Sequence, residues 1–391
     1  MKQNWEIKKL SEVLKIQNGY AFDAKLFTIE KGTPLIRIRD IKEGVGTVTN
    51  FNGKYDKKYE VNAGDFLIGM DGEFGCYEWK GDTALLNQRV CRLQEFSNKL
   101  YPRFLFYGIN KYLKAIENVT AFATVKHISS KQIENIEIPL PPLSEQKRIV
   151  ATLDEAFAAI AKAKANAEQN LKNAAALFES YLQGVFESGN WETKKLNEIT
   201  EVKDGTHDSP KYIPEGIPFV TQKNIRQDGL SFAGTKFITD TDHEKFYKRS
   251  NVTYGDILIS MIGANRGMAA IVDDKRIFSI KNVGLIKESE NINKQFLLYF
   301  LKSSLAMKYV LYMSNGGAQE FIGLTALRSF PIPYPPLKEQ QIIVQKLDAL
   351  IIETNKLETI YNQKINDLEE LKKSVLQKAF SGELKTNKLC V

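Results

Sequence analysis

The sequence is poor in the residues that build disulfide frameworks and metal sites. Its 391 residues contain three cysteines, none of them in a CxxC spacing. An odd number of isolated cysteines argues against a disulfide framework and against a zinc site, and it fits a reducing, cytoplasmic environment. The three histidines, His127, His207 and His243, also lack the spacing of metal ligands. We therefore expect no metal site on this chain.

Long apolar runs and phosphate-binding loops are missing as well. There is no stretch of 18 apolar residues and no charged segment leading into an apolar one, so we expect neither a membrane span nor a secretory signal. The lack of a GxxxxGKS or GxxxxGKT pattern argues against an NTPase. The composition, 43% apolar and 26% charged, is that of a soluble globular protein, and the length allows two domains. A net charge of +7 permits a nucleic-acid partner without requiring one.

One stretch of the chain occurs twice. Residues 138–154 read I-P-L-P-P-L-S-E-Q-K-R-I-V-A-T-L-D, and residues 332–348 read I-P-Y-P-P-L-K-E-Q-Q-I-I-V-Q-K-L-D. Proline restricts φ and disfavours helix in the residue before it, so each proline cluster should end an extended strand. A helix should begin at Leu143 and at Leu337, with Glu145 and Glu339 in first turns where the helix dipole favours an acid.

Further landmarks are duplicated in the same order. Residues 5–19 read W-E-I-K-K-L-S-E-V-L-K-I-Q-N-G and residues 191–205 read W-E-T-K-K-L-N-E-I-T-E-V-K-D-G. Three more pairs of segments match, at 32–41 and 216–225, 64–70 and 255–261, and 104–107 and 296–299. The chain therefore contains two copies of one domain, and the second copy should carry about eight extra residues in its loops.

Each copy is predicted to mix strands with helices. Residues 66–68 and 257–259 are apolar runs that lead into glycine-containing loops, which is typical of buried strands. Helical patterns occur near residues 102–116 and 293–312. Each repeated domain should therefore be of the α/β type.

Two long helices are predicted to follow the two copies. Between residues 143 and 187 there is no proline and a single glycine, Gly184. At about 1.5 Å per residue this helix would be on the order of 65 Å long. Apolar residues sustained at heptad spacing indicate a coiled coil. One helix is rich in alanine and the other in larger residues, so we expect them to pack on each other within one chain, with an intermolecular pair as the alternative. The first seam is Leu153, Ile160, Ala167, Ala174 and Tyr181.

The expected fold class is α+β, with two homologous α/β domains separated by two long antiparallel coiled-coil helices and a pseudo-two-fold axis. The predicted boundaries are 1–142 for the first domain, 143–187 for the first long helix, 188–336 for the second domain, 337–384 for the second long helix and 385–391 for a C-terminal tail. Antiparallel helices would place the domains at opposite ends. Such an arrangement suits a target with two separated sites, such as DNA half-sites at multiples of roughly 34 Å.

No catalytic set is evident in the sequence. Glu6 and Lys8, like Glu192 and Lys194, match the E-x-K half of a nuclease site, but too few residues precede the first copy to supply the acidic strand. We interpret these pairs as exposed strand ends. The two Pro-Pro pairs lack the polar residue before them and the aromatic residue after them that amino-methyltransferases carry.

The duplicated motifs resemble one known family. The P-L-P-P-L-S-E-Q segment at 139–146 and its copy at 333–340, the W-E-x-K-K-L opening, the Gly-Asp pairs at 64–65 and 255–256, T-V-K-H-I at 124–128 and D-G-T-H-D-S-P at 204–210 are similar to the specificity (S) subunit of type I restriction-modification enzymes, the HsdS family. The resemblance covers nearly the whole chain. Each motif alone would be weak, but their order and duplication are specific.

The resemblance implies a division of labour. Each target-recognition domain would bind one half of a bipartite double-stranded DNA sequence, and the helices would set the unread gap. Two modification subunits, carrying S-adenosylmethionine and methylating adenine, would dock on this chain, and restriction subunits using ATP and Mg²⁺ would be recruited. The chain itself would hold no cofactor and catalyse nothing. One departure from the repeat is that Glu320 and Phe321 stand where the first copy has Lys126 and His127.

Candidate DNA-binding residues are polar side chains in equivalent loops of the two copies. Bidentate donors such as Arg, Asn and Gln can read base edges, whereas Lys and Arg position the backbone. We expect Asp65 and Asp256 to be turn residues instead. The candidates are Tyr20, Lys25, Arg37, Arg39, Asn87, Gln88, Arg89, Lys126 and His127 in the first domain, and Thr206, His207, Lys211, Gln222, Lys223, Asn224, Asn265, Arg266, Lys281 and Asn282 in the second.

Two other classes of function remain open. A nuclease with an unrecognised active site would cut DNA without partners. A coiled-coil adaptor that does not bind DNA would show no sequence-dependent binding, and it leaves the divergent loop residues unexplained. The target bases and the gap length are not encoded in any pattern that can be read from one sequence.

Overall fold

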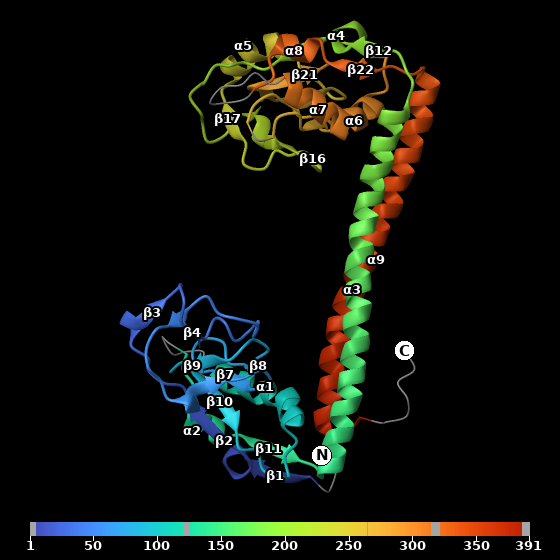
Figure 1. Ribbon diagram of the computed structural model, residues 1–391. Helices are drawn as coiled ribbons and strands as arrows, with labels where there is room; N and C mark the ends of the chain where they lie inside the picture. The colour runs from blue at the N-terminus through green and yellow to red at the C-terminus, as the bar shows by residue number, and fades with distance from the viewer. Residues whose placement is uncertain (1–4, 120–125, 264, 314–320, 385–391) are drawn as a thin grey trace. The chain divides into compact units, whose positions relative to one another are not determined.

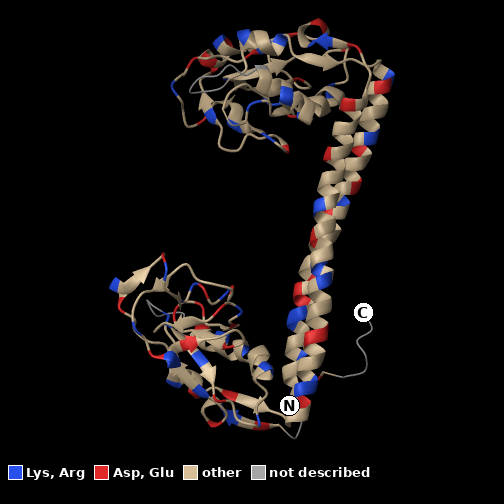
Figure 2. Cartoon of the chain, viewed as in Figure 1, with Lys and Arg blue, Asp and Glu red and all other residues tan. Residues whose placement is uncertain are grey.

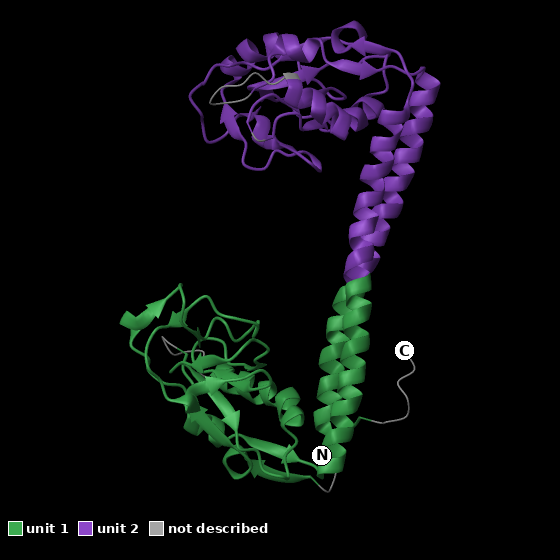
Figure 3. Cartoon of the chain, in the orientation of Figure 1, with its two compact units in different colours: residues 1–166, 364–391 green, residues 167–363 purple. Residues whose placement is uncertain are grey.

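The computed structural model describes residues 5–119, 126–263, 265–313 and 321–384. The chain divides into two compact units (Figure 3), one formed by residues 1–166 with 364–391 and the other by residues 167–363. Each unit contains one copy of the repeat together with parts of both long helices. The predicted tail at 385–391 and the motif residues 124, 125 and 318–320 lie outside the described residues.

The first unit builds its domain from three small sheets and two helices (Figure 1). The paired edge strands are β1 (Glu6–Lys9) and β11 (Glu137–Leu140). A four-stranded sheet has the order β2 (Lys15–Asn18), β10 (Val90–Gln94), β7 (Phe66–Gly69) and β8 (Cys76–Glu78). A five-stranded sheet has the order β3 (Phe27–Thr28), β5 (Asn50–Phe51), β4 (Thr33–Ile36), β9 (Ala84–Leu86) and β6 (Glu60–Val61). The helices are α1 (Pro102–Val119) and α2 (Ser130–Glu134).

The second unit repeats this plan. Strand β12 (Thr193–Lys195) pairs with β22 (Pro331–Pro333). The four-stranded sheet has the order β13 (Val202–Asp204), β21 (Val283–Ile286), β18 (Ile257–Ser260) and β19 (Ala269–Ile271), the same relative order as in the first unit. The other strands are β17 (Lys236–Ile238), β14 (Ile217–Val220), β20 (Ser279–Ile280), β15 (Ile225–Arg226) and β16 (Gly229–Leu230). The helices are α4 (Leu196–Ile199), α5 (Asp240–Ser250), α6 (Lys294–Lys302), α7 (Ser304–Met313) and α8 (Leu324–Arg328).

The structure of the second copy differs from the sequence-based prediction in two places. The extra residues of the second copy are not confined to loops, since α5 falls in the interval where that copy is longer. The helical pattern at 293–312 is also interrupted. Ser303 is extended and its hydroxyl accepts the Ala306 N–H, so it ends α6 and caps α7. Serine favours this role because its side chain satisfies an otherwise unpaired N–H of the next helix.

The two long helices that the sequence predicts are α3 (Leu143–Ser188) and α9 (Leu337–Ser381). In the first unit, the start of α3 shares a core with the end of α9, where Leu153 and Val375 are buried. In the second unit, the end of α3 shares a core with the start of α9, through Leu182 and Leu347. In both units, residues near the start of one long helix therefore share a core with residues near the end of the other, which confirms that the helices pair antiparallel.

The predicted seam of α3 is correct for its first four positions and wrong at the fifth. Leu153, Ile160, Ala167 and Ala174 are buried, but Tyr181 is 40% exposed and Leu182 is buried in its place. An α-helix drifts by about 20° per heptad relative to a strict seven-residue repeat. After four heptads this drift approaches one residue, so the buried stripe moves to the next position.

A buried glutamine fixes the beginning of each long helix to its own domain. Gln146 is fully buried; its Oε1 accepts the Tyr101 N–H at 2.7 Å, and its Nε2 donates to the carbonyls of Lys99 and Pro141, both at 2.8 Å. Gln340, also fully buried, repeats two of these bonds. All of these partner atoms belong to the main chain, so the P-P-L-x-E-Q motif forms a joint between the domain and its helix.

In the second unit, Gln340 Oε1 accepts the Asn293 N–H at 2.8 Å and Nε2 donates to the Pro335 carbonyl at 2.8 Å.

Cys76 and Cys91 are buried free thiols in the first domain, and burial raises the pKa of Cys91 to about 12. None of the helices in the described ranges is long and apolar enough to cross a membrane.

Candidate nucleic-acid interface

In the first domain, the end of β2 lies against the turn between β9 and β10. The Tyr20 N–H donates to the Leu86 carbonyl at 2.9 Å, and the Gln88 N–H donates to the Tyr20 carbonyl at 3.0 Å. This approach requires glycine at position 19, where a Cβ would lie 2.0 Å from the Asn87 carbonyl oxygen. The turn 87–89 is therefore held against the main chain of Tyr20, whose side chain is half-exposed, and the structure brings these predicted residues together.

The second domain contains the same arrangement with different side chains. The Thr206 N–H donates to the Ile280 carbonyl at 3.1 Å, and the Asn282 N–H donates to the Thr206 carbonyl at 3.1 Å. A Cβ at Gly205 would lie 2.4 Å from the Ile280 oxygen. The turn here is one residue shorter, carrying Lys281 and Asn282, and Asn282 adopts a left-handed φ of 53°.

The loop after β7 adds charged side chains to the first domain's cluster. The Asp71 carboxylate lies 2.6 Å from His127 Nδ1 and 3.3 Å from an Arg89 guanidinium nitrogen. Lys126 turns away from this group and pairs at 3.2 Å with the buried Glu117 carboxylate. In the second domain, Ile262 and Phe321 form the bridge that Asp71 and His127 form in the first.

A buried carboxylate organises the corresponding region of the second domain. Asp204 is 5% exposed and accepts two hydrogen bonds from Arg249, at 2.9 and 2.8 Å, which raises the pKa of that guanidinium. The His207 ring lies between the Asp204 carboxylate, 3.2 Å from Nε2, and the Asn282 Oδ1, 2.7 Å from Nδ1. His207 is thereby tied to the 281–282 turn while its ring remains largely exposed.

Asn224 has a structural role that the sequence reasoning did not recognise. It is 4% exposed; its Oδ1 accepts the Thr221 N–H at 2.9 Å, and its Nδ2 donates to the Ser231 carbonyl at 2.9 Å. Asp40 occupies the equivalent position in the first copy, where it accepts the Arg37 N–H at 2.8 Å. The shared carboxamide or carboxylate caps a turn, and both ends of the Asn224 amide are hydrogen-bonded within the domain.

The remaining candidates lie on other loops of their own domains. Arg37 and Arg39 are exposed after β4, and Lys25 is exposed in the short 3₁₀ turn Ala24–Leu26. Lys211 and Asn265 are exposed loop residues of the second domain, and Arg266 is half-buried. Gln222 and Lys223 line a cavity together with Lys281 and Asn282. Two further cations of this cavity, Arg226 and Lys236, were not singled out from the sequence.

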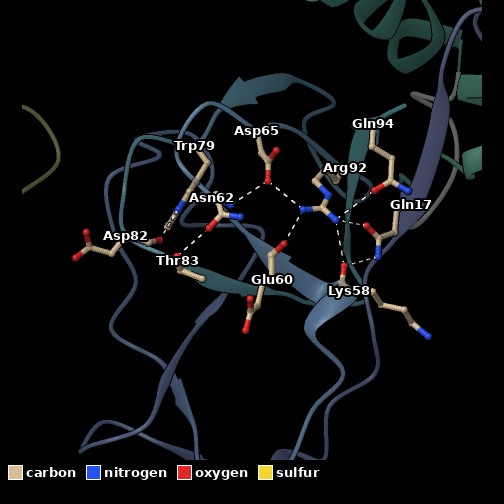
Figure 4. Close-up of polar contacts among 10 residues, drawn as sticks. All are labelled: Gln17, Lys58, Glu60, Asn62, Asp65, Trp79, Asp82, Thr83, Arg92 and Gln94. Carbon is tan, nitrogen blue, oxygen red and sulfur yellow. Dashed lines mark hydrogen bonds and ion pairs between the residues drawn. The ribbon is translucent and has the colours of Figure 1, made fainter. Parts of the chain in front are cut away.

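The Gly-Asp turns are structural, as the sequence predicts. In the first domain Asp65 Oδ2 accepts the Asn62 N–H at 2.9 Å and an Arg92 N–H at 3.0 Å (Figure 4). Arg92 also donates to the carbonyls of Glu60 and Lys58, so one guanidinium ties three segments together. In the second domain the fully buried Asp256 accepts the Thr253 N–H at 2.8 Å.

Asp256 also accepts the Glu288 N–H at 2.9 Å, and its carboxylate pairs with Lys287 at 2.6 Å. The two Gly-Asp turns thus use basic partners at different positions of the neighbouring strand. Both carboxylates accept hydrogen bonds from main-chain N–H groups and pair with one cation. The Gly-Asp turns are therefore alike in the two domains, whereas the polar turns described above differ.

The family is shown by comparison with known proteins. The sequence model described as "Type I restriction modification DNA specificity domain" matches residues 2–172 and again residues 188–369. The type I restriction enzyme EcoBI specificity subunit of Escherichia coli is 31% identical, over 97% of this chain and 86% of that protein. The MjaVIII specificity subunit of Methanocaldococcus jannaschii is 24% identical, over 99% of this chain and 94% of that protein. The chain therefore belongs to the family of type I restriction-modification specificity subunits.

Solved structures share the fold. The HsdS subunit from Thermoanaerobacter tengcongensis superimposes with a TM-score of 0.63 at 19% identity, covering 98% of both chains. A chain from a structure on complex assembly and conformational transition of the type I R-M system gives a TM-score of 0.70 at 20% identity, covering 98% of this chain and 99% of that one. The duplicated-domain architecture with two long helices is thus the fold of this family.

Proposed function

We propose that this specificity subunit binds double-stranded DNA, with each domain reading one half of a bipartite target. The observation that supports this is a main-chain geometry that the two domains share, combined with side chains that differ between them. The turn beside Tyr20 carries Asn, Gln and Arg, whereas the turn beside Thr206 carries Lys and Asn on the same hydrogen-bonded frame. Two domains that recognise different DNA sequences require different side chains on the same frame, because base edges are distinguished by their patterns of hydrogen-bond donors and acceptors.

In this proposal the long helices set the unread gap and dock two modification subunits. S-adenosylmethionine belongs to those partners, and ATP and Mg²⁺ belong to restriction subunits, so the chain itself is a non-catalytic, cytoplasmic scaffold without a cofactor. The relatives named above are specificity subunits, which supports assigning the chemistry to other chains. The absence of a phosphate-binding loop from the sequence is consistent with this assignment.

Methylation mapping tests the proposal directly. The chain is co-expressed with its modification subunit in a host free of DNA methylation, and genomic DNA is sequenced for methyladenine. We expect one bipartite motif with a fixed unread gap. A soluble complex that leaves the DNA unmodified would contradict the proposal and favour the adaptor, whereas cleavage of DNA by the purified chain alone would favour a nuclease.

A further inference from the structure

A cavity of about 470 Å³ in the second domain is lined by basic side chains from three separate segments. Lys223 follows β14, Arg226 lies in β15, Lys236 begins β17 and Lys281 lies in the turn between β20 and β21. Among the described residues that line it there is no acidic side chain. The cavity therefore gathers four positive charges beside the turn that carries Asn282.

These cations differ from several basic residues of the same unit that form ion pairs. Acidic and basic residues are interspersed over both units (Figure 2). Lys287 lies 2.6 Å from Asp256, and Lys294 lies 2.6 Å from Glu288.

Within the described part of the chain, none of the four cavity cations has a carboxylate at ion-pair distance. The Lys236 ammonium lies 4.3 Å from the centre of the Tyr212 ring, and Lys281 donates to the Ser209 hydroxyl. Four unneutralised cations around one hollow repel each other and attract a polyanion.

The equivalent loop of the first domain is not arranged in this way. The hollow beside Arg37 is lined by one cation and one acid, Arg37 and Glu30. The hollow beside Tyr20, which lies against the 87–89 turn, is lined by Lys54, Lys58 and Asp56, and Lys58 pairs with Asp56 at 3.0 Å. The two domains therefore share the fold and the turn geometry but differ in the charge that flanks the turn. Four basic side chains without an acidic neighbour line the hollow of the second domain, whereas each of these two hollows of the first domain contains an acid.

We infer that this cavity binds phosphodiester groups of the DNA backbone, and that the second domain therefore anchors the duplex more strongly than the first. The inference rests on the proposed function. Lys and Arg that contact phosphates release condensed counterions, which makes binding steeply dependent on salt but carries no sequence information. Lys223, Arg226 and Lys236 thus determine affinity and register, while the bases are read by the neighbouring turn.

The test compares two triple variants with the same net charge. The cavity variant carries Lys223→Gln, Arg226→Gln and Lys236→Gln. The control variant carries Lys203→Gln, Lys294→Gln and Lys308→Gln, which lie outside the cavity lining and already pair with glutamates at 3.2, 2.6 and 3.2 Å. The full chain is co-purified with its modification subunits. Binding to a labelled duplex bearing the mapped motif is measured by fluorescence anisotropy between about 50 and 200 mM salt.

We expect the cavity variant to lower the slope of log K against log salt by roughly 0.9 per lost contact, about 2.7 in total, with an unchanged methylation motif. The control should keep the slope of the unsubstituted chain. A charge-keeping variant, Lys223→Arg with Arg226→Lys and Lys236→Arg, should restore the slope.

Equal slopes in the cavity and control variants would overturn the inference, as would a changed base in the motif. Failure of the proposed function is distinguishable, because the unsubstituted chain would then bind the motif duplex no better than a scrambled one.

Discussion

Replacing Gln146 by alanine should loosen the joint between the first domain and its long helix. The side chain is fully buried and makes three hydrogen bonds, all to main-chain atoms. At a net value of about 1 kcal/mol for each bond, the substitution should reduce the free energy of unfolding by about 3 kcal/mol, before any contribution from the cavity that it leaves. Gln340→Ala removes two bonds and should lower it by about 2 kcal/mol.

Urea denaturation followed by circular dichroism measures the loss. With an m-value of roughly 2 kcal/mol per molar urea, Gln146→Ala should lower the midpoint by about 1.5 M. Hydrogen exchange read by mass spectrometry assigns the effect to the first unit, where the Tyr101 amide should exchange faster. The matched control is Gln169→Ala on the same helix, where the side chain is exposed and donates a hydrogen bond to Asn173.

The control should change stability by no more than about 0.5 kcal/mol, since it is a surface substitution. If Gln146→Ala and Gln169→Ala have the same midpoint, the glutamine joint does not stabilise the domain in the way described. A faster exchange confined to the second unit would contradict the assignment as well.

Three further predictions concern the turns and the helices. Gly205→Ala should prevent the close approach of the chain after β13 to the 281–282 turn and lower the urea midpoint. Gly184→Ala, where a Cβ meets no atom within 4 Å, should instead raise the free energy of unfolding by about 1 kcal/mol. Equal effects of the two substitutions would contradict the steric argument. Asp256→Asn breaks the ion pair of a fully buried carboxylate and should lower the free energy of unfolding by about 3–5 kcal/mol, measured by urea titration, while Asp65→Asn, whose side chain is 29% exposed, should lower it by less. Deleting one heptad from each long helix should change the unread gap found by methylation mapping and leave both half-sites unchanged. Altered half-sites with an unchanged gap would refute the proposal that the helices set the gap.

Much of the fold could be predicted because its signals are local and occur twice. The proline clusters before Leu143 and Leu337 exclude helix, and proline-free heptads follow them, so both helix starts are visible in the sequence. The shift of the buried position from Tyr181 to Leu182 does not follow from a strict seven-residue repeat, because a straight helix keeps such a repeat in register for only a few turns.

The candidate site was less predictable because residue type does not reveal what a side chain contacts. Asn224 has the chemistry of a base reader, yet its amide is used within a turn; the Asp at position 40 of the other copy was the available signal, since Asp and Asn share the capping role. Arg226 and Lys236 come together with Lys281 only through strand pairing. No local pattern marks such a group.

The glutamine joint has a consequence for how such a protein can diversify. Its partners are carbonyls and amides that every residue other than proline provides, so the joint places almost no demand on the side chains of the domain it holds. A domain with altered reading turns can therefore keep the same joint, while the apolar side chains that share a core with Leu153 and Val375 remain the part of the domain that must match the helices. The attachment stays constant while the specificity evolves.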